Sequence, residues 1–228
     1  MATRLRPITE RIPKVLVPVA GRPFLEHQLE LLRRQGLTRV VLCLGHLGEM
    51  VRDQFGTGEA QGMQLHYSFD GPVLLGTGGA LKRALPLLGQ RFFVLYGDSY
   101  LPVEFKPIAE CLARSGKLGL MTVYRNEGRY DTSNVVFAEG QIQVYDKRQK
   151  RPDMQHIDYG LSVLRAEALA DWPADQPFDL AEVLQRLVAQ GQLAGHEVTQ
   201  RFYEIGSHTG LAELETWLGQ RGSAGVEI

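Results

Sequence analysis

Strand-length apolar runs alternate along this chain with segments of helical period, and this alternation limits the possible folds. Residues 39–44 (RVVLCL) and 91–96 (RFFVLY) are nearly continuous apolar runs, whereas residues 24–32 place apolar side chains at helical spacing. Parallel strands need a crossover, usually a helix, and such crossovers are right-handed. The pattern therefore predicts a mostly parallel sheet, in which residues 39–44 form a strand buried on both faces.

The pattern changes after about residue 118. Strands are expected at 118–124, 135–138 and 142–145 with little helix between them, and Glu139-Gly140 is a hairpin signal. An antiparallel excursion from an otherwise parallel sheet would produce this order of elements. The fold class predicted is α/β: a Rossmann-like three-layer sandwich with a mostly parallel mixed sheet.

Helical spacing returns near the carboxyl end. Asp179 with Glu182 resembles a capping box, which predicts a helix from residue 180, and a last helix is expected around Leu211–Leu218. We find no repeat or linker and predict a single domain, residues 1–228. Its expected parts are a nucleotide-binding part (1–117), a sugar-binding part (118–165) and a C-terminal part (166–228).

Composition excludes several classes of protein. The chain has 25 Lys and Arg against 26 Asp and Glu, so its formal charge is −1, which argues against partners such as nucleic acid or an anionic membrane. No apolar run approaches the ~18–20 residues of a membrane span, and no signal peptide is visible, so we expect a cytoplasmic protein. Cys43 and Cys111 are expected to be buried free thiols, and the histidines show no zinc-binding spacing.

Two segments have residues suited to phosphate groups. Thr3, Arg4 and Arg6 with Lys14 would suit a polyphosphate, although a solvated basic segment has the same composition. Gly76-Thr77-Gly78-Gly79 precedes a helical segment, so a ligand could approach its backbone. A packing turn explains these glycines equally well, and the segment matches neither the P-loop nor the GxGxxG pattern.

Three further segments have charged residues directly after apolar runs. Asp98 follows 91–96 and could hold a divalent cation or cap the next turn. Glu204 is a second candidate metal ligand, and Ser207 beside it could cap the last helix. In the charge run Asp146-Lys147-Arg148, which could simply be solvated, Lys147 is the candidate closest to the strand end.

Taken in order, these segments resemble the sugar-1-phosphate nucleotidyltransferases. The family motifs T-R-L-x-P and P-K-x-L-x-P-V-x-G-x-P correspond to residues 3–7 and 13–23, and G-T-G/A-G corresponds to Gly76–Gly79. The matches to the other motifs, some of them approximate, are Gly97-Asp98, Asp146-Lys147, Asp158-Tyr159-Gly160 and Glu204-Ile205-Gly206-Ser207. Within the superfamily the chain is most similar to the branch that acts on mannose- or heptose-1-phosphate, which includes guanylyltransferases.

The resemblance implies a reaction and a role for each motif. A sugar-1-phosphate oxygen would attack the α-phosphorus of an NTP with Mg²⁺ as cofactor, and a homodimer is possible in this family. The implied roles are: Arg4 and Lys14 catalytic, at the triphosphate; Thr3, Gly76, Thr77, Gly78 and Gly79 nucleotide-binding; Asp98 and Glu204 metal-binding; Asp146, Lys147, Asp158, Tyr159 and Gly160 sugar-phosphate-binding.

The chain departs from the family pattern at three places. Glu204 stands where Asp is usual, and Asp146 stands where Glu is usual. The family's first strand and the glycine half of its phosphate loop have no counterpart, so we expect such a chain to fold poorly or to fill the gap otherwise, and to bind NTP weakly. A non-catalytic nucleotide-sugar-binding or regulatory protein is therefore the alternative. A GT-A glycosyltransferase is disfavoured because Asp98 is not part of a D-x-D motif.

Overall fold

A computed structural model describes residues 8–223, and the predictions for Thr3 and Arg4 lie outside this range. Its largest element is a six-stranded sheet ordered β11-β7-β10-β8-β9, with β5 also paired to β10. Strand β10 runs antiparallel to β5, β7 and β8, whereas β11 runs parallel to β7. The strands are β5 (Arg91–Leu95), β7 (Gly119–Arg125), β8 (Val135–Ala138), β9 (Gln141–Tyr145), β10 (His156–Arg165) and β11 (Leu193–Val198).

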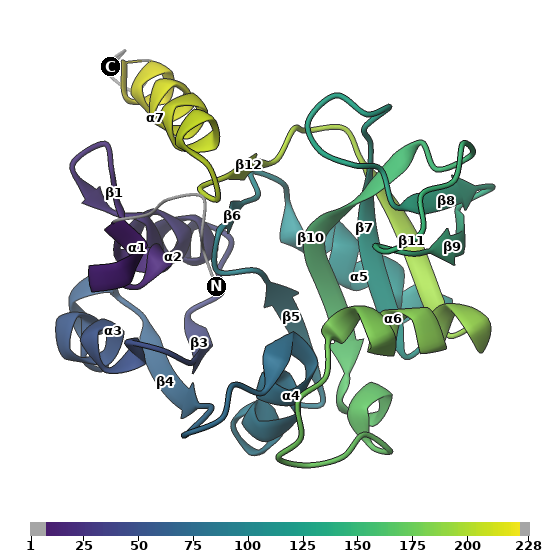
Figure 1. The fold of residues 1–228 in the computed structure, drawn as a ribbon, viewed down its shortest axis with the longest axis horizontal. Helices are drawn as coiled ribbons and strands as arrows, with labels where there is room; N and C mark the ends of the chain where they lie inside the picture. Colours follow the sequence, from purple (N-terminus) through teal and green to yellow (C-terminus); the bar gives the residue numbers. More distant parts are fainter. Residues whose placement is uncertain (1–7, 224–228) are drawn as a thin grey trace.

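Three two-stranded pairs complete the β structure (Figure 1). The longest joins β3 (Arg39–Leu44) to β4 (Gln64–Phe69) in parallel register. The two short antiparallel pairs are β1 (Pro18–Val19) with β2 (Arg22–Pro23), and β6 (Ser99–Tyr100) with β12 (Tyr203–Glu204). The β6–β12 pair brings segments about a hundred residues apart to one place, which positions the site described below.

Helices cover the strands from both sides. They are α1 (Ile8–Arg11), α2 (Phe24–Arg34), α3 (Gly48–Phe55), α4 (Gly76–Ala84), α5 (Phe105–Ser115), α6 (Leu180–Ala189) and α7 (His208–Ser223). One apolar core packs α2, α3 and α5 against the strands, and a second core packs α4 and α6 against them. The predicted three-layer α/β architecture with a mixed sheet is therefore confirmed.

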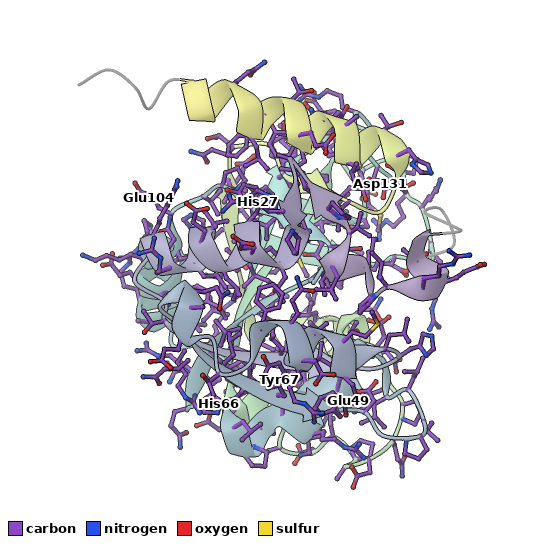
Figure 2. The ribbon with its side chains drawn as sticks, turned by 90° about the vertical axis from the view of Figure 1, so that its left-hand side faces the viewer. His27, Glu49, His66, Tyr67, Glu104 and Asp131 are labelled. Atoms are coloured by element: carbon purple, nitrogen blue, oxygen red, sulfur yellow. The ribbon has the colours of Figure 1, made fainter. Side chains whose placement is uncertain are left out.

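Helix α7 lies across the β1–β2 hairpin and α2, above His27 in the view of Figure 2. Its Trp217 packs against the rings of Tyr100 and Tyr203, with centroids 5.4 and 5.2 Å apart. Buried His27 closes the other side of the hairpin, because its Nε2 is 2.8 Å from the carbonyl oxygen of Val19. These contacts fix the turn between β12 and α7 relative to β6.

Local signals in the sequence predicted several elements correctly. Glu139 and Gly140 have φ values of 52° and 72° and join β8 to β9 as a hairpin. The Asp179 carboxylate accepts the backbone N–H of Ala181 at 2.8 Å, and the Glu182 carboxylate accepts that of Asp179 at 3.2 Å. This is the predicted capping box of α6.

The predicted burial of residues 39–44 is wrong. They form strand β3, but its residues are only partly buried, and Cys43 is exposed. The reason is that β3 pairs with β4 on one side only within the described residues. Cys111 is half-buried, so both thiols are free as expected but neither is fully buried.

The three predicted parts of the chain contribute strands to the same sheet. Strand β5 comes from the first part, β7 to β10 come from the second and β11 from the third. The boundaries at 117 and 165 stay predictions. Among the described residues, no helix is long and apolar enough to cross a membrane.

Candidate functional site

A cavity of about 1,010 Å³ opens beyond the end of β5, where the β6–β12 pair, the loop after β7 and the loop after β9 meet. Its walls have five cations, which can bind phosphate groups, and five carboxylates, which can bind a metal ion or sugar hydroxyls. The cations are Lys14, Arg129, Lys147, Lys150 and Arg201, and the carboxylates are Asp98, Asp131, Asp158, Glu204 and Glu213. Figure 2 shows Asp131 beside the start of α7.

Lys14 and Asp98 form one side of the site. The Lys14 Nζ is 2.8 Å from the Asp98 Oδ2, and the side chains are 20% and 41% exposed. The backbone of Asp98 is fixed as well, because its carbonyl accepts the N–H of Ile205 at 2.9 Å. Asp98, which was expected as a carboxylate at the end of a strand, is therefore ion-paired with Lys14 and accessible from the cavity.

Glu204 reaches the same cavity through the register of β6 and β12, in which it pairs with Ser99. Its carboxylate folds back onto the turn before α7 and accepts the N–H of Gly206 and the hydroxyl of Ser207, the latter at 2.8 Å. The Ser207 Oγ in turn accepts the N–H of Gly210 at 3.0 Å. Ser207 thus caps α7 as the sequence suggested, and Glu204 supports that cap.

The donor chemistry of Asp98 and Glu204 fits Mg²⁺, which usually binds one or two carboxylates together with substrate phosphates and water. Both carboxylates are hard oxygen donors on adjacent backbone positions, since Ser99 is the register partner of Glu204. Within the described range no cluster of three or more His, Cys, Asp or Glu side chains is suited to hold a metal. A metal here would therefore need ligands from the substrate.

Lys147, in the loop after β9, lines the same cavity. Its Nζ lies 3.3 Å from the Tyr96 hydroxyl and 3.6 Å from the Asp158 Oδ2. The same ammonium lies over the rings of Tyr96 and Tyr145, at 5.0 and 5.8 Å from their centroids. The side chain is 39% exposed, so a positioned cation is available to an anionic group in the cavity.

Asp158 is held in a bulge of β10, where the register with β7 shifts between Asp158 and Ser162. Its side chain is 3% exposed, and its carboxylate accepts the Tyr145 hydroxyl and the N–H of Gly160, each at 3.0 Å. Gly160 has a φ of 93°, which a residue with a Cβ adopts only with strain. The Tyr159 ring is buried among other aromatic rings, so its main contribution is to the packing of the wall.

Two phenols in this wall are surrounded by carboxylates. Burial raises the pKa of Tyr96, and the charges of Asp158, Asp179 and Asp98 raise it further. Burial and the charge of Asp158 likewise raise the pKa of Tyr145. Both phenols therefore stay protonated and act as hydrogen-bond donors at neutral pH.

The Gly76–Gly79 segment begins α4, and its glycines are explained by packing. A Cβ on Gly78 would lie 2.4 Å from the ring of Phe178, and one on Gly79 would lie 2.4 Å from the carbonyl oxygen of Gln176. The hydroxyl of Thr77 donates to the Asp179 carboxylate at 3.0 Å and accepts the N–H of Leu180 at 2.9 Å. None of these contacts tests nucleotide binding, which stays a prediction for this segment.

Asp146 does not line the cavity that Lys147 lines. Its carboxylate accepts the backbone N–H groups of Arg148 and Gln149, at 2.7 and 3.0 Å. These hydrogen bonds lower the pKa of Asp146, which is the behaviour of a turn-capping carboxylate. The structure thus brings together Lys14, Asp98, Glu204, Lys147, Asp158, Tyr159 and Gly160, and places Asp146 and Gly76–Gly79 outside this cavity.

Sequence reasoning missed the loop after β7, which contributes Arg129, Tyr130, Asp131 and Thr132 to the cavity. Asn126 is fully buried and anchors this loop: its Nδ2 donates to the Asp131 carbonyl at 2.6 Å and to the Ser133 Oγ at 3.1 Å. Its Oδ1 accepts the N–H of Tyr130 at 3.2 Å. The polar pair Arg125-Asn126, which directly follows the apolar strand 118–124, was the available signal.

Arg201 is a further missed residue. Its guanidinium lies between two rings, 4.2 Å from the centroid of Tyr130 and 4.8 Å from that of Tyr203, and it is paired with Glu213 of α7. It therefore links the loop after β7 to α7 across the cavity mouth. No local motif in the sequence marks this contact.

Comparison with known proteins places the chain in a family. Residues 1–218 match the family described as "Nucleotidyl transferase". A D-glycero-alpha-D-manno-heptose 1-phosphate guanylyltransferase of Campylobacter jejuni is 30% identical over 186 residues, 81% of each chain. A UTP--glucose-1-phosphate uridylyltransferase of Synechocystis is 28% identical over 209 residues, 83% of this chain and 53% of its own length.

The chain thus spans about half the length of the Synechocystis relative. In fold it is similar to a solved Bacillus anthracis structure, assigned as a glucose-1-phosphate thymidylyltransferase, with a TM-score of 0.81 at 18% identity. That match covers 95% of this chain and 90% of the other. The family match over nearly the whole chain, together with the cavity formed at its motif residues, shows that this protein belongs to the nucleotidyl transferase family.

Proposed function

We propose that the protein transfers a nucleotidyl group from an NTP to a sugar 1-phosphate and releases pyrophosphate. The observation that carries the proposal is that two ion pairs, Lys14 with Asp98 and Lys147 with Asp158, line one cavity. Two separate cations suit two phosphorylated substrates bound side by side. The family match and the names of both relatives support the same class of reaction.

The proposed reaction is a single in-line displacement. An oxygen of the sugar phosphate forms a bond to the α-phosphorus, the α–β phosphoanhydride bond breaks, and pyrophosphate leaves with the bonding electron pair. Such chemistry depends on positioning and on stabilisation of charge more than on a covalent nucleophile. The paired cations and carboxylates of this cavity can provide both.

Each side of the cavity has a proposed role. Lys14, with Arg4 from the N-terminal motif, would bind the triphosphate and stabilise charge at the α-phosphate, and Lys147 would bind the sugar phosphate. Tyr96 keeps Lys147 in place through a 3.3 Å contact. Asp98 and Glu204 would hold Mg²⁺, which when bound would neutralise charge on the phosphates.

We propose guanine as the first base to test and mannose or heptose 1-phosphate as the first sugars. The Campylobacter jejuni relative, which is a heptose-phosphate guanylyltransferase, matches 81% of both chains. A cytoplasmic location and a homodimer also stay predictions.

A nucleotide-sugar-binding protein without catalytic activity is the second candidate. The observation in its favour is an open groove beside β5, the strand that leads to Asp98. If that groove leaves the side chains of the site too poorly positioned for catalysis, the chain would bind nucleotide sugars without turnover.

The test is pyrophosphate release with a panel of NTPs and sugar 1-phosphates, measured with and without Mg²⁺. Activity with one pair is expected, and the Asp98→Asn variant should lose about a hundredfold or more of it, because a metal-binding carboxylate is removed. Asp153→Asn is the matched control, since Asp153 pairs with Arg151 outside the cavity. Equal turnover in both variants would remove Asp98 from the metal site.

A further inference from the structure

Asn134, the residue directly before β8, lines the cavity together with Lys147 and Asp158. Its backbone is fixed by two hydrogen bonds: its N–H donates to the His156 carbonyl and its carbonyl accepts the N–H of Asp146, each at 2.9 Å. These bonds tie it to β10 and to the loop after β9. The residue is half-buried, so the cavity wall has a fixed amide side chain at this position.

One hydrogen bond sets the orientation of the Asn134 amide. The backbone N–H of Asp158 donates to the Asn134 Oδ1 at 2.9 Å. A backbone N–H can only donate, so the amide atom that it meets must be the oxygen and not the nitrogen. The Nδ2 atom, with its two N–H donors, is therefore the free branch of the amide.

The Nδ2 atom of Asn134 is accessible from the cavity. It has no hydrogen-bond partner among residues 8–223, in contrast to the Oδ1 of the same amide. It is also not one of the buried side-chain atoms that lack a partner, so solvent reaches it. A ligand in the cavity can therefore accept a hydrogen bond from Nδ2 without displacing a protein contact.

A structural role for Asn134 accounts for only one branch of the amide. Strand β8 pairs with β10 through Val135 and His156, and the N–H of Asp158, two residues along β10, lies on the same edge as that of His156. The Asn134 Oδ1 extends the pairing by one hydrogen bond. An aspartate could supply the same oxygen, whereas the Nδ2 donors have no part in this contact.

The neighbours of Asn134 indicate which part of a sugar phosphate it meets. Lys147, the proposed ligand of the sugar phosphate, lies 3.6 Å from the side chain of the same Asp158 whose backbone holds Asn134. Asp158 itself is 3% exposed, and its carboxylate already accepts the Tyr145 hydroxyl and the Gly160 N–H. The accessible neutral donor beside the phosphate position is therefore the Asn134 amide.

A neutral amide donor suits a hydroxyl oxygen, while the phosphate charge suits the Lys147 ammonium. In a sugar 1-phosphate the hydroxyl on C2 is the one closest to the phosphate, because C2 is bonded to the anomeric carbon. With the phosphate at Lys147, the C2 hydroxyl is thus the hydroxyl nearest to the Asp158 backbone and to Asn134.

We propose that Asn134 is a specificity-determining residue that donates a hydrogen bond from Nδ2 to the C2 hydroxyl of the sugar 1-phosphate. The inference rests on the proposed function, because it requires a sugar phosphate in this cavity. The configuration at C2 distinguishes mannose from glucose. A donor held at one place therefore favours one of these two sugars, whereas Lys147 binds the phosphate of either.

The experiment measures binding without turnover. Calorimetry gives the dissociation constants of mannose 1-phosphate, of glucose 1-phosphate and of the 2-deoxy-hexose 1-phosphate that lacks the C2 hydroxyl of both. Mg²⁺ and a panel of α,β-methylene NTP analogues are present, in which the α–β linkage cannot be cleaved.

Three variants are compared with the unchanged protein. Asn134→Asp keeps an oxygen for the Asp158 N–H and removes the donor, and Asn134→Ala removes both. Gln149→Glu is the matched control, since it introduces the same change of charge at an exposed residue of the loop after β9, outside the cavity. Melting temperatures of all four proteins report their folding.

The unchanged protein should bind one hexose 1-phosphate about tenfold more tightly than the 2-deoxy compound, because one hydrogen bond is gained. Asn134→Asp and Asn134→Ala should bind all three compounds with nearly equal affinity, and Gln149→Glu should keep the preference. A merely structural role would weaken the binding of all three compounds alike and leave their ratio unchanged.

Two results would overturn the assignment of Asn134 alone: equal binding of the three compounds by the unchanged protein, or a preference that persists in Asn134→Asp. If the unchanged protein bound no hexose 1-phosphate with any of the nucleotide analogues, the proposed function itself would be contradicted, and the role of Asn134 with it.

Discussion

At the scale of single residues, the buried carboxylate of Asp158 depends on its donors. It is 3% exposed and accepts the Tyr145 hydroxyl at 3.0 Å and the Gly160 N–H at 3.0 Å, with Lys147 at 3.6 Å. A buried carboxylate that loses a hydrogen-bond donor still has the free-energy cost of desolvation, but it no longer has the hydrogen bond that offset this cost. The Tyr145 hydroxyl therefore stabilises the fold as well as the site.

Tyr145→Phe should lower the free energy of unfolding by about 1–3 kcal/mol, because one donor to Asp158 is lost. Denaturant unfolding measures the change. Tyr67→Phe is the control, since the hydroxyl of the half-buried Tyr67 on β4 (Figure 2) donates to the Gly56 carbonyl at 2.6 Å in a solvent-exposed hydrogen bond. Equal losses in the two variants would contradict a special dependence of Asp158 on Tyr145.

Cys43 combines exposure with a raised pKa. Its thiol is open to solvent on one side and crowded by protein on the others, and this burial, with the charge of Asp70, raises its pKa to about 11. The thiolate is the reactive form. Alkylation of Cys43 should therefore keep accelerating, by about tenfold per pH unit, up to about pH 11.

Peptide mapping after short exposure to iodoacetamide measures this rate at Cys43, and Cys43→Ser confirms which peptide is labelled. A rate that levels off near pH 9 would show that the thiol has an ordinary pKa and that its surroundings do not disfavour the thiolate.

Among the elements, the start of α4 needs glycine for packing. A Cβ at position 79 would lie 2.4 Å from a backbone oxygen, which cannot move as a side chain end can. Gly79→Ala should therefore destabilise the protein by about 1–3 kcal/mol through overpacking.

Gly219→Ala in α7 is the matched control, since a Cβ there meets nothing within 4 Å. It should stabilise the helix by up to about 1 kcal/mol, because Ala has the higher helix propensity. Melting temperatures measure both changes. A neutral Gly79→Ala would show that the loop at Gln176 yields easily and that packing does not require the glycine.

The loop after β7 should control the sugar side of the site. Asn126 fixes this loop through three hydrogen bonds, and the loop contributes residues 129–132 to the cavity. Asn126→Ala should raise the KM for sugar 1-phosphate several-fold and leave the KM for NTP nearly unchanged. Steady-state kinetics with each substrate varied in turn measures this. Ser133→Ala, which removes one of the three bonds, should give a smaller effect, and equal rises in both KM values would indicate a general loss of structure.

Elements with local signals were predictable from the sequence, and those that depend on distant contacts were not. The hairpin at Glu139-Gly140 and the capping box at Asp179 follow from their own residues. Strand β10, the ten-residue centre of the sheet, was missed because a bulge with Asp158 and Gly160 interrupts its apolar pattern. Strand β11 was missed for a similar reason, since Gly195 and His196 break its run.

The same difference between local signals and distant contacts holds for the candidate site. Asp98 and Lys147 could be predicted because each follows an apolar strand. Their meeting in one cavity could not, because it depends on the β6–β12 pair and on the sheet order. Arg201 was missed because its position between Tyr130 and Tyr203 arises only when the loop after β7 meets α7.

For the whole molecule, the open groove and the site are linked. Tyr96 and Gly97, which join β5 to Asp98, line the groove, and Tyr96 also lines the site.

The most direct test of the central claim follows the α-phosphorus of the nucleotide. Each NTP, labelled at this phosphorus, is incubated with mannose, heptose or glucose 1-phosphate and Mg²⁺ in the presence of the protein. The proposed reaction predicts that the label moves into a sugar nucleotide while unlabelled pyrophosphate is released, and that Asp98→Asn prevents this. Label that stays in the NTP with every pair of substrates would contradict nucleotidyl transfer.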